Sequence, residues 1–378
     1  MRSHRYLIVG GGMTADSACR GIRDHDGDGS IGLVSAESHP PYSRPPLSKA
    51  LWQGKDESSI WRGTEDLGVD LILGRRITAL GLEARRAADD QGEEYEYERL
   101  LLATGGTPRR LPDAPDAVYF RTLDDYRRLR EAASEGTDAL VVGGGFIGSE
   151  LAAALQSNGA AVTMVFPDDG ICARLFPSDL SSFVTDYYRE QGVQVRTGEL
   201  ADPAEVAAAP VVVAGLGIQP ATDLAEAAGL PVDDGIVVDD RGRVGGRDDV
   251  YAAGDVARFP VPALGTTIRV EHEDHANTHG RTVGANMAGA DTPYDHLPFF
   301  YSDLFDLGYE AVGELDPRHE TVEHWKEPGR EGVVAYVEPN GKPRGFLLWN
   351  VWGKVDDARA LIRAGKGIDE STVTELAG

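Results

Sequence analysis

The stretch Tyr6-Leu-Ile-Val-Gly-Gly-Gly-Met-Thr-Ala15 decides the fold, and a close copy of it, Ala139-Leu-Val-Val-Gly-Gly-Gly-Phe-Ile-Gly148, follows later in the chain. Each copy begins with a short apolar run that is typical of a buried strand and ends in glycines that open a helical stretch. Other apolar runs, such as Leu101–Ala103, alternate with helical patterns along the chain. The sequence therefore predicts an α/β fold that contains the same strand–turn–helix unit twice.

The glycine spacing in the first copy is that of a phosphate cradle for a dinucleotide. Gly10 permits a tight turn, Gly12 lets the backbone approach a pyrophosphate, and the small Ala15 lets the helix pack on its strand. The N-terminus of the helix then faces the negative charge. An acid at the end of the next strand, which we expect at residues 31–36, accepts hydrogen bonds from ribose hydroxyls. The expected contact residues are Gly10, Gly12, Met13, Thr14, Ala15 and Glu37.

The second copy predicts a second cradle, for a nicotinamide dinucleotide. Its next strand is expected at residues 161–166 and is followed by Asp168, which reaches the adenine ribose and repels a 2′-phosphate. Arg174 would do the opposite, but we expect NADH rather than NADPH. The expected contact residues are Gly143, Gly145, Phe146, Ile147, Gly148, Asp168 and Arg174.

The length of 378 residues suits two or three domains. We predict a discontinuous first domain over residues 1–110 and 231–298, and a second over 111–230. Aromatic strands near 332–337 and 345–350, a turn at Asn340-Gly341 and a helix near 355–364 predict a small α+β domain over 299–378. The predicted fold class is α/β, with two three-layer dinucleotide-binding (Rossmann-like) domains and a C-terminal α+β domain.

Composition excludes several functions. The formal net charge of −25 argues against nucleic-acid binding and makes an acidic protein partner harder to attract. No apolar run reaches the length of a membrane span, and no secretory signal can be fitted to the first residues, so we expect a cytoplasmic protein. The two cysteines, Cys19 and Cys172, cannot build a disulfide framework.

Three further motifs identify the family. They are the stretches 41–49 (PYSRPPLSK), 102–106 (LATGG) and 250–255 (VYAAGD). With the two cradles, they make the chain resemble the flavoproteins with two dinucleotide-binding domains, in the pyridine nucleotide-disulfide oxidoreductase superfamily. Within this superfamily the chain resembles the branch of ferredoxin reductases and apoptosis-inducing factor. The resemblance implies FAD in the first cradle and NAD(H) in the second.

The resemblance also implies roles for individual residues. Lys49 would lie near the flavin ring, Asp255 would bind the ribityl chain or pyrophosphate, and Phe146 would cover the flavin until nicotinamide displaces it. Further FAD contacts would be Arg44, Thr104, Gly105 and Arg121, and further NAD contacts would be Gly215 and Gly217.

The C-terminal part resembles apoptosis-inducing factor more than the bacterial ferredoxin reductases. Its motifs are Val270-Glu271-His272, Tyr301-Ser-Asp-Leu304, Gly308-Tyr-Glu310 and Leu348-Trp-Asn350. By this resemblance Glu271, His272 and Tyr301 would lie on the FAD side, and Glu310 and Asn350 on the NAD side. Typical bacterial ferredoxin reductases carry a tryptophan where His272 stands, and the mammalian pattern has a tryptophan where Tyr301 stands.

Two sets of ionisable residues need an explanation. Glu150 falls inside the apolar stripe of its helix, and a charge on an inward face needs a partner. Lys49 is the expected partner, and the alternative is a half-exposed Glu150 at the edge of the stripe. His272, His275 and His279 share a helical face, but no cysteine or carboxylate completes a ligand set, so we predict no metal site. We expect His272 beside flavin or nicotinamide, and the other two as packing or surface residues.

The predicted activity is that of an FAD-dependent NAD(P)H oxidoreductase. Hydride would pass from NADH to flavin N5, with Lys49, Glu150, Phe146 and His272 at the reacting centre. The acceptor would be a ferredoxin- or rubredoxin-like protein, a quinone or another acceptor. Two alternatives stay open: an NADH-sensing or assembly protein similar to apoptosis-inducing factor, whose redox state alters association such as homodimer formation, and a monodehydroascorbate-type reductase.

Overall fold

The computed structural model describes all 378 residues, and the chain folds into two compact units. Unit 1 comprises Met1–Arg44, Glu57–Thr107 and Gln219–Pro298, and unit 2 comprises Pro45–Asp56, Pro108–Ile218 and Phe299–Gly378. Unit 2 thus joins the second cradle to the C-terminal residues and also takes in a short segment from early in the chain. The predicted division into three domains stays a prediction beside this division into two units.

Unit 1 is built on a seven-stranded sheet in the order β3-β2-β1-β6-β5-β4, with β14 beside β6. Its central strand β1 runs parallel to both β2 and β6, so both of its edges are paired. Because such a strand is covered on both faces, it is apolar without alternation, as in Leu7-Ile-Val9. The strands are β1 (Arg2–Val9), β2 (Ile31–Ser35), β3 (Val69–Leu73), β4 (Ile77–Gly81), β5 (Arg86–Asp89), β6 (Glu94–Leu102) and β14 (Val250–Ala252).

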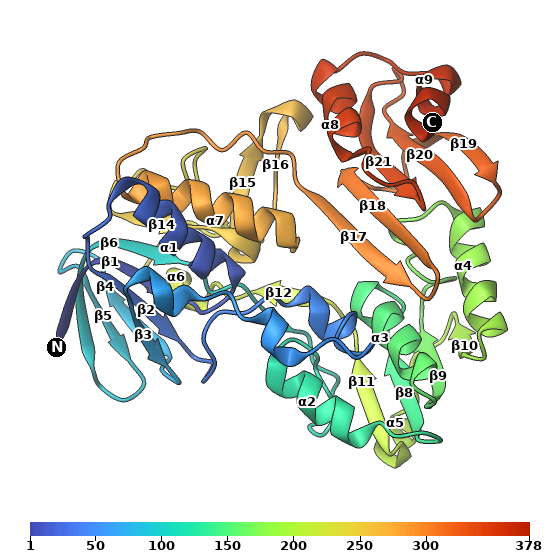
Figure 1. Cartoon of the computed structure of the whole chain (residues 1–378), viewed down its shortest axis with the longest axis horizontal. Coiled ribbons are helices and arrows are strands. Elements are labelled where there is room, and N and C mark those ends of the chain that lie inside the picture. The colour runs from blue at the N-terminus through green and yellow to red at the C-terminus, as the bar shows by residue number, and fades with distance from the viewer. The chain divides into compact units, whose positions relative to one another are not determined.

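Two helices, α1 (Met13–His25) and α7 (Glu273–Met287), pack together against this sheet. Figure 1 shows them side by side, with α1 in blue and α7 in orange. They approach closely because small residues line the contact: a Cβ on Gly284 would lie 2.1 Å from the carbonyl oxygen of Ala18. The smaller elements of unit 1 include α6 (Asp223–Ala227) and the three-stranded sheet of β13 (Ile236–Val237), β15 (Ala257–Val261) and β16 (Thr266–Ile268).

Unit 2 contains a four-stranded parallel sheet in the order β10-β9-β8-β11, which repeats the order of β3-β2-β1-β6 in unit 1. The first strand of each unit, β1 or β8, therefore lies between its second strand and a later one. The elements are β8 (Asp138–Val142), β9 (Ala161–Phe166), β10 (Gln194–Thr197), β11 (Val211–Ala214), α2 (Leu123–Ala132), α3 (Phe146–Ser157), α4 (Ser178–Glu190) and α5 (Pro203–Ala208). Two short strands, β7 (Gly106–Pro108) and β12 (Ile218–Pro220), pair with each other.

The C-terminal part of unit 2 is a five-stranded antiparallel sheet in the order β17-β18-β21-β20-β19. Helix α8 contacts β18 and β21, while α9 contacts β19 and β20. Figure 1 shows β17 beside α3, a contact that brings the sheet to the second cradle. The elements are β17 (Phe299–Leu304), β18 (Leu307–Gly313), β19 (Glu320–Glu327), β20 (Glu331–Val337), β21 (Pro343–Trp349), α8 (Val355–Ala364) and α9 (Glu370–Ala377).

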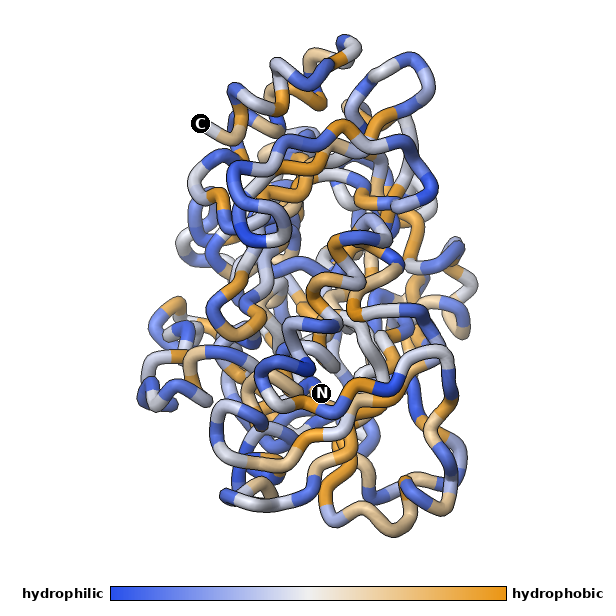
Figure 2. The backbone as a smooth tube through the Cα atoms, turned by 90° about the vertical axis from the view of Figure 1, so that its right-hand side faces the viewer, coloured by the Kyte–Doolittle hydropathy of each residue, from blue (hydrophilic) through white to orange (hydrophobic).

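The predicted α/β class, with two dinucleotide-binding-type sheets and an α+β C-terminal part, is confirmed. The predicted strands at 161–166 and 332–337 and the predicted helix at 355–364 are all present. Figure 2 shows hydrophobic stretches only a few residues long, each interrupted by hydrophilic residues. No helix is both long enough and apolar enough to cross a bilayer.

Candidate functional site

Both glycine cradles sit at the carboxyl end of the first strand of their unit and have the same backbone geometry. Gly10 has φ +130° and Gly143 has φ +115°, values that favour glycine. A Cβ at Gly10 would lie 2.1 Å from the carbonyl oxygen of Ala103, and a Cβ at Gly143 would lie 2.3 Å from that of Gly215. A side chain at either position would therefore collide with backbone, so only glycine closes the turn.

The N-terminal ends of α1 and α3, which face these turns, offer backbone N–H groups to a ligand. Gly12 and Gly145 are the N-caps of α1 and α3, and neither helix has a side chain that caps its first turn. A Cβ at Gly145 would meet nothing within 4 Å, and a Cβ at Gly12 would meet only Arg44, at 3.8 Å. Uncapped backbone N–H groups beside open space can bind a pyrophosphate. Met13 and Thr14 begin α1, while Phe146, Ile147 and Gly148 begin α3.

In unit 1 the acid at the end of the second strand is held by two partners. The hydroxyl of Tyr42 donates to Glu37 Oε2 at 2.5 Å, and Arg44 Nη2 lies 2.5 Å from Glu37 Oε1. Burial opposes the charge of Arg44, but the nearby groups Glu37, Tyr42 and Asp255 raise the pKa of its guanidinium. Arg44 therefore stays charged, beside a carboxylate at the position that binds ribose in this type of cradle.

Asp255 is carried to the first cradle by a tight turn, the 3₁₀ segment η4 (Gly254–Val256). A Cβ at Gly254 would lie 2.2 Å from the hydroxyl oxygen of Thr14, so this turn packs directly on the start of α1. The backbone N–H of Gly254 donates to Nδ1 of His279 at 3.3 Å. The predicted FAD residues Gly10, Gly12, Thr14, Glu37, Arg44 and Asp255 are thus gathered around one helix end in unit 1.

Other predicted FAD residues lie elsewhere in unit 1. The hydroxyl of Thr104 donates to the carbonyl oxygen of Ala221 at 2.8 Å, and Gly105 accepts from the N–H of Ala221 at 2.9 Å. Glu271 pairs with Arg269 at 2.8 Å. His272 is the N-cap of α7, and burial lowers its pKa to about 4, although Asp255 and Asp274 oppose that shift. His272 is therefore neutral at pH 7.

In unit 2 the predicted acid and base of the second cradle bind each other. Arg174 donates to Oδ1 of Asp168 through Nε at 3.2 Å and through Nη2 at 3.1 Å. The Arg174 side chain is 80% exposed and that of Asp168 is 34% exposed. Since a pair this exposed contributes little to stability, both groups remain available to a ribose or to a 2′-phosphate. Gly215 packs on Gly148, and Gly217 has a left-handed backbone.

The predicted ion pair between Lys49 and Glu150 is confirmed. Lys49 Nζ lies 2.5 Å from Glu150 Oε1, and the two side chains are only 11% and 6% exposed. The ammonium also lies 5.4 Å from the centre of the Tyr301 ring, a cation–π distance. The apolar stripe that led to this prediction is present in the structure, because Glu150 is buried on α3 next to the buried Leu151.

The remaining predicted residues of unit 2 are spread over several elements. The Phe146 ring packs edge-on against Phe300, with ring centres 5.2 Å apart. Arg121 precedes α2, and its backbone N–H donates to Asp125 at 3.1 Å. Glu310 accepts from the N–H of Gly353 at 3.2 Å.

Asn350 accepts from the N–H of Gly308 and donates to the carbonyl oxygen of Arg330, both at 2.8 Å. Both ends of its side-chain amide are therefore hydrogen-bonded within the protein. The NAD contacts proposed for Glu310 and Asn350 stay predictions.

Three residues that the structure places at these sites were not selected from the sequence. Tyr42 binds Glu37, and the hydroxyls of Ser48 and Ser302 both donate to Glu150, each at 2.6 Å. Ser48 directly precedes Lys49, which is a usable signal. Ser302 has none, because a serine within a strand is common and lies 152 positions from Glu150.

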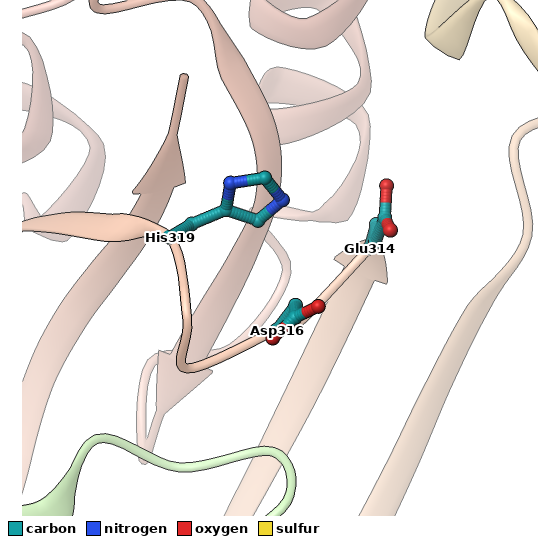
Figure 3. A group of neighbouring side chains, drawn as sticks. All are labelled: Glu314, Asp316 and His319. Atoms are coloured by element: carbon teal, nitrogen blue, oxygen red, sulfur yellow. The ribbon is translucent and has the colours of Figure 1, made fainter. Parts of the chain in front are cut away.

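Figure 3 shows a group of possible metal ligands in unit 2, namely Glu314, Asp316 and His319. Their ligand atoms lie within 4.8 Å of one another. However, Arg344 Nη2 lies 2.5 Å from Glu314, and Arg318 Nε donates to Asp316 at 2.9 Å. The Arg318 guanidinium lowers the pKa of Asp316 to about 2. Since arginines already neutralise both carboxylates, we assign no cation to this group.

The residues present fit two dinucleotides. Each cradle offers an uncapped helix end, a glycine turn that admits no side chain, and an acid beyond the second strand. The buried ion pair of Lys49 and Glu150 supplies charge in unit 2. Both cysteines are free and buried, which raises the pKa of each thiol.

Comparison with known proteins agrees with this geometry. The pyridine nucleotide-disulphide oxidoreductase family matches residues 4–280, and the C-terminal domain of mitochondrion-associated apoptosis-inducing factor matches residues 283–331. Apoptosis-inducing factor 1 of Dictyostelium discoideum is 33% identical over 97% of this chain and 79% of its own length. The ferredoxin–NAD(+) reductase component of the anthranilate 1,2-dioxygenase system of Burkholderia cepacia is 32% identical over 97% of this chain and 95% of its own length.

Among solved structures, the reductase of the covalent putidaredoxin reductase–putidaredoxin complex has a TM-score of 0.89 and 26% identity. The match covers 100% of this chain and 96% of that one. The family relation accounts for both cofactors that the cradles fit. The chain therefore belongs to the pyridine nucleotide-disulphide oxidoreductase family and is an FAD-dependent NAD(P)H oxidoreductase.

Proposed function

We propose that this chain oxidises NADH through bound FAD and passes the electrons to a small ferredoxin- or rubredoxin-like protein. The observation that carries the proposal is the pair of equivalent cradles, which lets one chain hold a hydride donor and a redox cofactor together. FAD, when bound, supplies the chemistry by accepting two electrons as hydride and releasing them singly.

In this proposal the residues of the chain bind, orient and stabilise. Gly12 and the first turn of α1 hold the FAD pyrophosphate, and Arg44 and Asp255 fix its position. Gly145 and the first turn of α3 hold the NADH pyrophosphate, and Asp168 accepts from its adenine ribose. Lys49 would supply a positive charge for the flavin, and Glu150 would keep that charge in place. Phe146 would cover the flavin until nicotinamide displaces it.

Disulfide reduction, which the family name includes, does not suit this chain. That chemistry needs a thiolate. Burial raises the pKa of the Cys172 thiol to about 12, although a hydrogen bond from Ser149 opposes the shift, and burial also raises the pKa of Cys19. Neither cysteine is a thiolate at neutral pH, so the electrons leave by another route.

One relative and one structural neighbour support a protein acceptor. One is named a ferredoxin–NAD(+) reductase, and the structural neighbour was solved in complex with putidaredoxin. The net charge of −25 weakens attraction to an acidic ferredoxin. We therefore expect slow association at low ionic strength and faster association at high salt, which screens the repulsion.

A second candidate function is redox sensing, in which the reduced protein persists and changes its association, for example by forming a homodimer. The motif Val270-Glu271-His272 and the apoptosis-inducing factor match at 283–331 favour it. Other relatives are named monodehydroascorbate reductases, so monodehydroascorbate is a further acceptor to test.

One experiment separates these candidates. The protein is reduced anaerobically with NADH and then mixed with a ferredoxin, a rubredoxin, a short-chain quinone or monodehydroascorbate, while flavin absorbance is followed. The proposal predicts fastest reoxidation by one of the two iron–sulfur proteins. Reoxidation that is slow with all four, together with a larger sedimentation coefficient for the reduced protein, would replace it with the sensing function.

A further inference from the structure

The carboxylate of Glu150 receives three donors from two separate segments of unit 2. Lys49 Nζ lies 2.5 Å from Oε1, and the Ser302 hydroxyl donates to the same oxygen at 2.6 Å. The Ser48 hydroxyl donates to Oε2 at 2.6 Å. Glu150 is 5% exposed, so water does not replace these donors. Ser48 and Lys49 are neighbours in η1 (Pro45–Ser48) and directly after it, whereas Ser302 lies within β17.

We propose that Ser48 and Ser302 are positioning residues that keep Glu150 charged and directed at Lys49. This inference rests on the function proposed for the ion pair. A buried carboxylate holds its charge only when its oxygens are satisfied, and Lys49 satisfies Oε1 alone. Ser48 supplies the donor for Oε2, and Ser302 fixes the side of Oε1 from which Lys49 can approach.

The fold holds Ser302 rigidly in place. The β17–β18 hairpin turns at Phe305, which has φ +62° although it is a bulky residue. Its ring packs edge-on against Tyr188 of α4, with ring centres 5.0 Å apart. The Tyr188 hydroxyl donates to the carbonyl oxygen of Ser149 at 3.0 Å, one residue before Glu150. The strand that carries Ser302 is therefore docked through α4 onto the helix that carries Glu150.

The surroundings of Glu150 contain few groups that titrate near neutral pH. Its ionisable neighbours are Lys49, Cys172, Tyr188, Asp303 and Tyr309. Burial raises the pKa values of Cys172, Tyr188 and Tyr309 far above neutrality. Burial also raises the pKa of Asp303, while Lys49 lowers it. On the acid side, Asp303 is the other carboxyl beside Glu150, and Asp303→Asn distinguishes the two. His272, whose pKa burial lowers to about 4, is unchanged in both serine variants and so cannot cause a difference between them and the wild type.

The test follows the rate of flavin reduction by NADH against pH, by anaerobic rapid mixing of the FAD-loaded protein. In Ser48→Ala and Ser302→Ala, the carboxylate has lost a donor to its charged form, so proton uptake becomes easier. The acid limb of the profile should move to higher pH by about one unit in each variant and further in the double variant. Asp303→Asn should leave the limb within about 0.3 unit of the wild-type position, because it removes no donor to Glu150.

Ser181→Ala is the matched control. Ser181 is also a buried serine of unit 2 at 3% exposure, but its hydroxyl donates to the carbonyl oxygen of Ile171 at 2.8 Å. It should leave the pH profile unchanged. At position 48, Thr and Val have nearly the same shape, so Ser48→Thr should keep the wild-type profile while Ser48→Val should behave as Ser48→Ala. This comparison still decides the question if an alanine variant loses FAD.

The outcomes separate this inference from the proposed function. If Glu150→Gln keeps the wild-type rate and profile, the ion pair has no part in reduction and the proposed role of Lys49 fails. If Glu150→Gln changes them while the double serine variant and Ser48→Val keep the wild-type acid limb, the positioning inference is wrong and the function stands. A shifted limb in both serine variants, with none in Ser181→Ala, supports the inference.

Discussion

At the scale of single residues, the carboxylates of Glu37 and Glu150 are held in place by hydrogen bonds and ion pairs inside the fold. Glu37 is held by Tyr42 and Arg44, and Glu150 by Lys49 and two serines. A charge that is already oriented does not have to reorganise when substrate arrives. Removal of one member of such a pair, however, leaves the charge of the other member buried without an opposite charge beside it, which destabilises the fold.

Lys49→Met tests the charge at the proposed flavin position. A cation near N5 favours the reduced cofactor, so its loss should lower the midpoint potential of the bound FAD. A Coulomb energy of about 1–4 kcal/mol at close range corresponds to a drop on the order of 20–90 mV for a two-electron couple. The measurement is dye equilibration of Lys49→Met beside Lys55→Met, a lysine of the same unit on the surface. An unchanged potential in Lys49→Met would remove Lys49 from the chemistry.

Asp168→Asn tests the choice of nicotinamide nucleotide. The carboxylate repels a 2′-phosphate, and its removal should lower the ratio of kcat/KM for NADH over NADPH by about tenfold, on the order of 1.4 kcal/mol. Arg174→Ala should act in the opposite direction, because it removes the cation that binds Asp168 at 3.1 Å. A wild-type preference for NADPH would show that Arg174 dominates.

Some of these residues could be predicted from the sequence and others could not. Gly10 and Gly143 follow from local spacing, and the need of Glu150 for a partner follows from a charge inside an apolar stripe. The family resemblance pointed to Lys49 as that partner. Ser302 could not be predicted, since its contact depends on how β17 docks on α3 and no local pattern encodes that. Tyr42 was not predicted either, because Glu37 was considered as an acceptor for ribose hydroxyls and no local pattern linked it to Tyr42.

At the scale of elements, helix α7 contains buried histidines. His275 and His279 are fully buried within it, and His272 is its N-cap. The His275 ring stacks on Phe259, with ring centres 4.3 Å apart, and its Nδ1 lies 3.1 Å from the Tyr294 hydroxyl. Shared helical spacing predicted one common face for these histidines, and the structure packs His275 and His279 into the core of unit 1.

This helix should make unit 1 sensitive to acid. Burial lowers the pKa of His272 to about 4, that of His279 to about 3, and that of His275 well below its usual value of 6.5. Below pH 6.5 the unfolded chain therefore binds protons that the folded unit does not, and the free energy of unfolding falls. The loss is about 1.4 kcal/mol per pH unit for each histidine, and it levels off below the folded pKa values.

Chemical denaturation between pH 7.5 and pH 4.5 measures this slope. His279→Gln should flatten it, because one proton-linked group is gone. His25→Gln, at an exposed position in the same unit, should not. A stability that does not change over this range in the wild-type protein would contradict the prediction.

At the scale of the whole molecule, each unit contains one copy of the same cradle. The sheet orders β3-β2-β1-β6 and β10-β9-β8-β11 repeat the same plan, and the sequence predicted this from its two glycine stretches. The sequence did not indicate that residues 45–56 and 299–378 would join unit 2. That grouping depends on long-range contacts, such as those between α3 and β17, which have no local signal.

The central claim is that one chain holds FAD and reduces it with NADH. An anaerobic titration of the purified protein with NADH, followed at the flavin absorbance bands, tests it most directly. The account predicts yellow protein with equimolar FAD, bleached completely by an equimolar amount of NADH. Protein that cannot be reconstituted with FAD, or bound FAD that neither NADH nor NADPH reduces, would contradict the account.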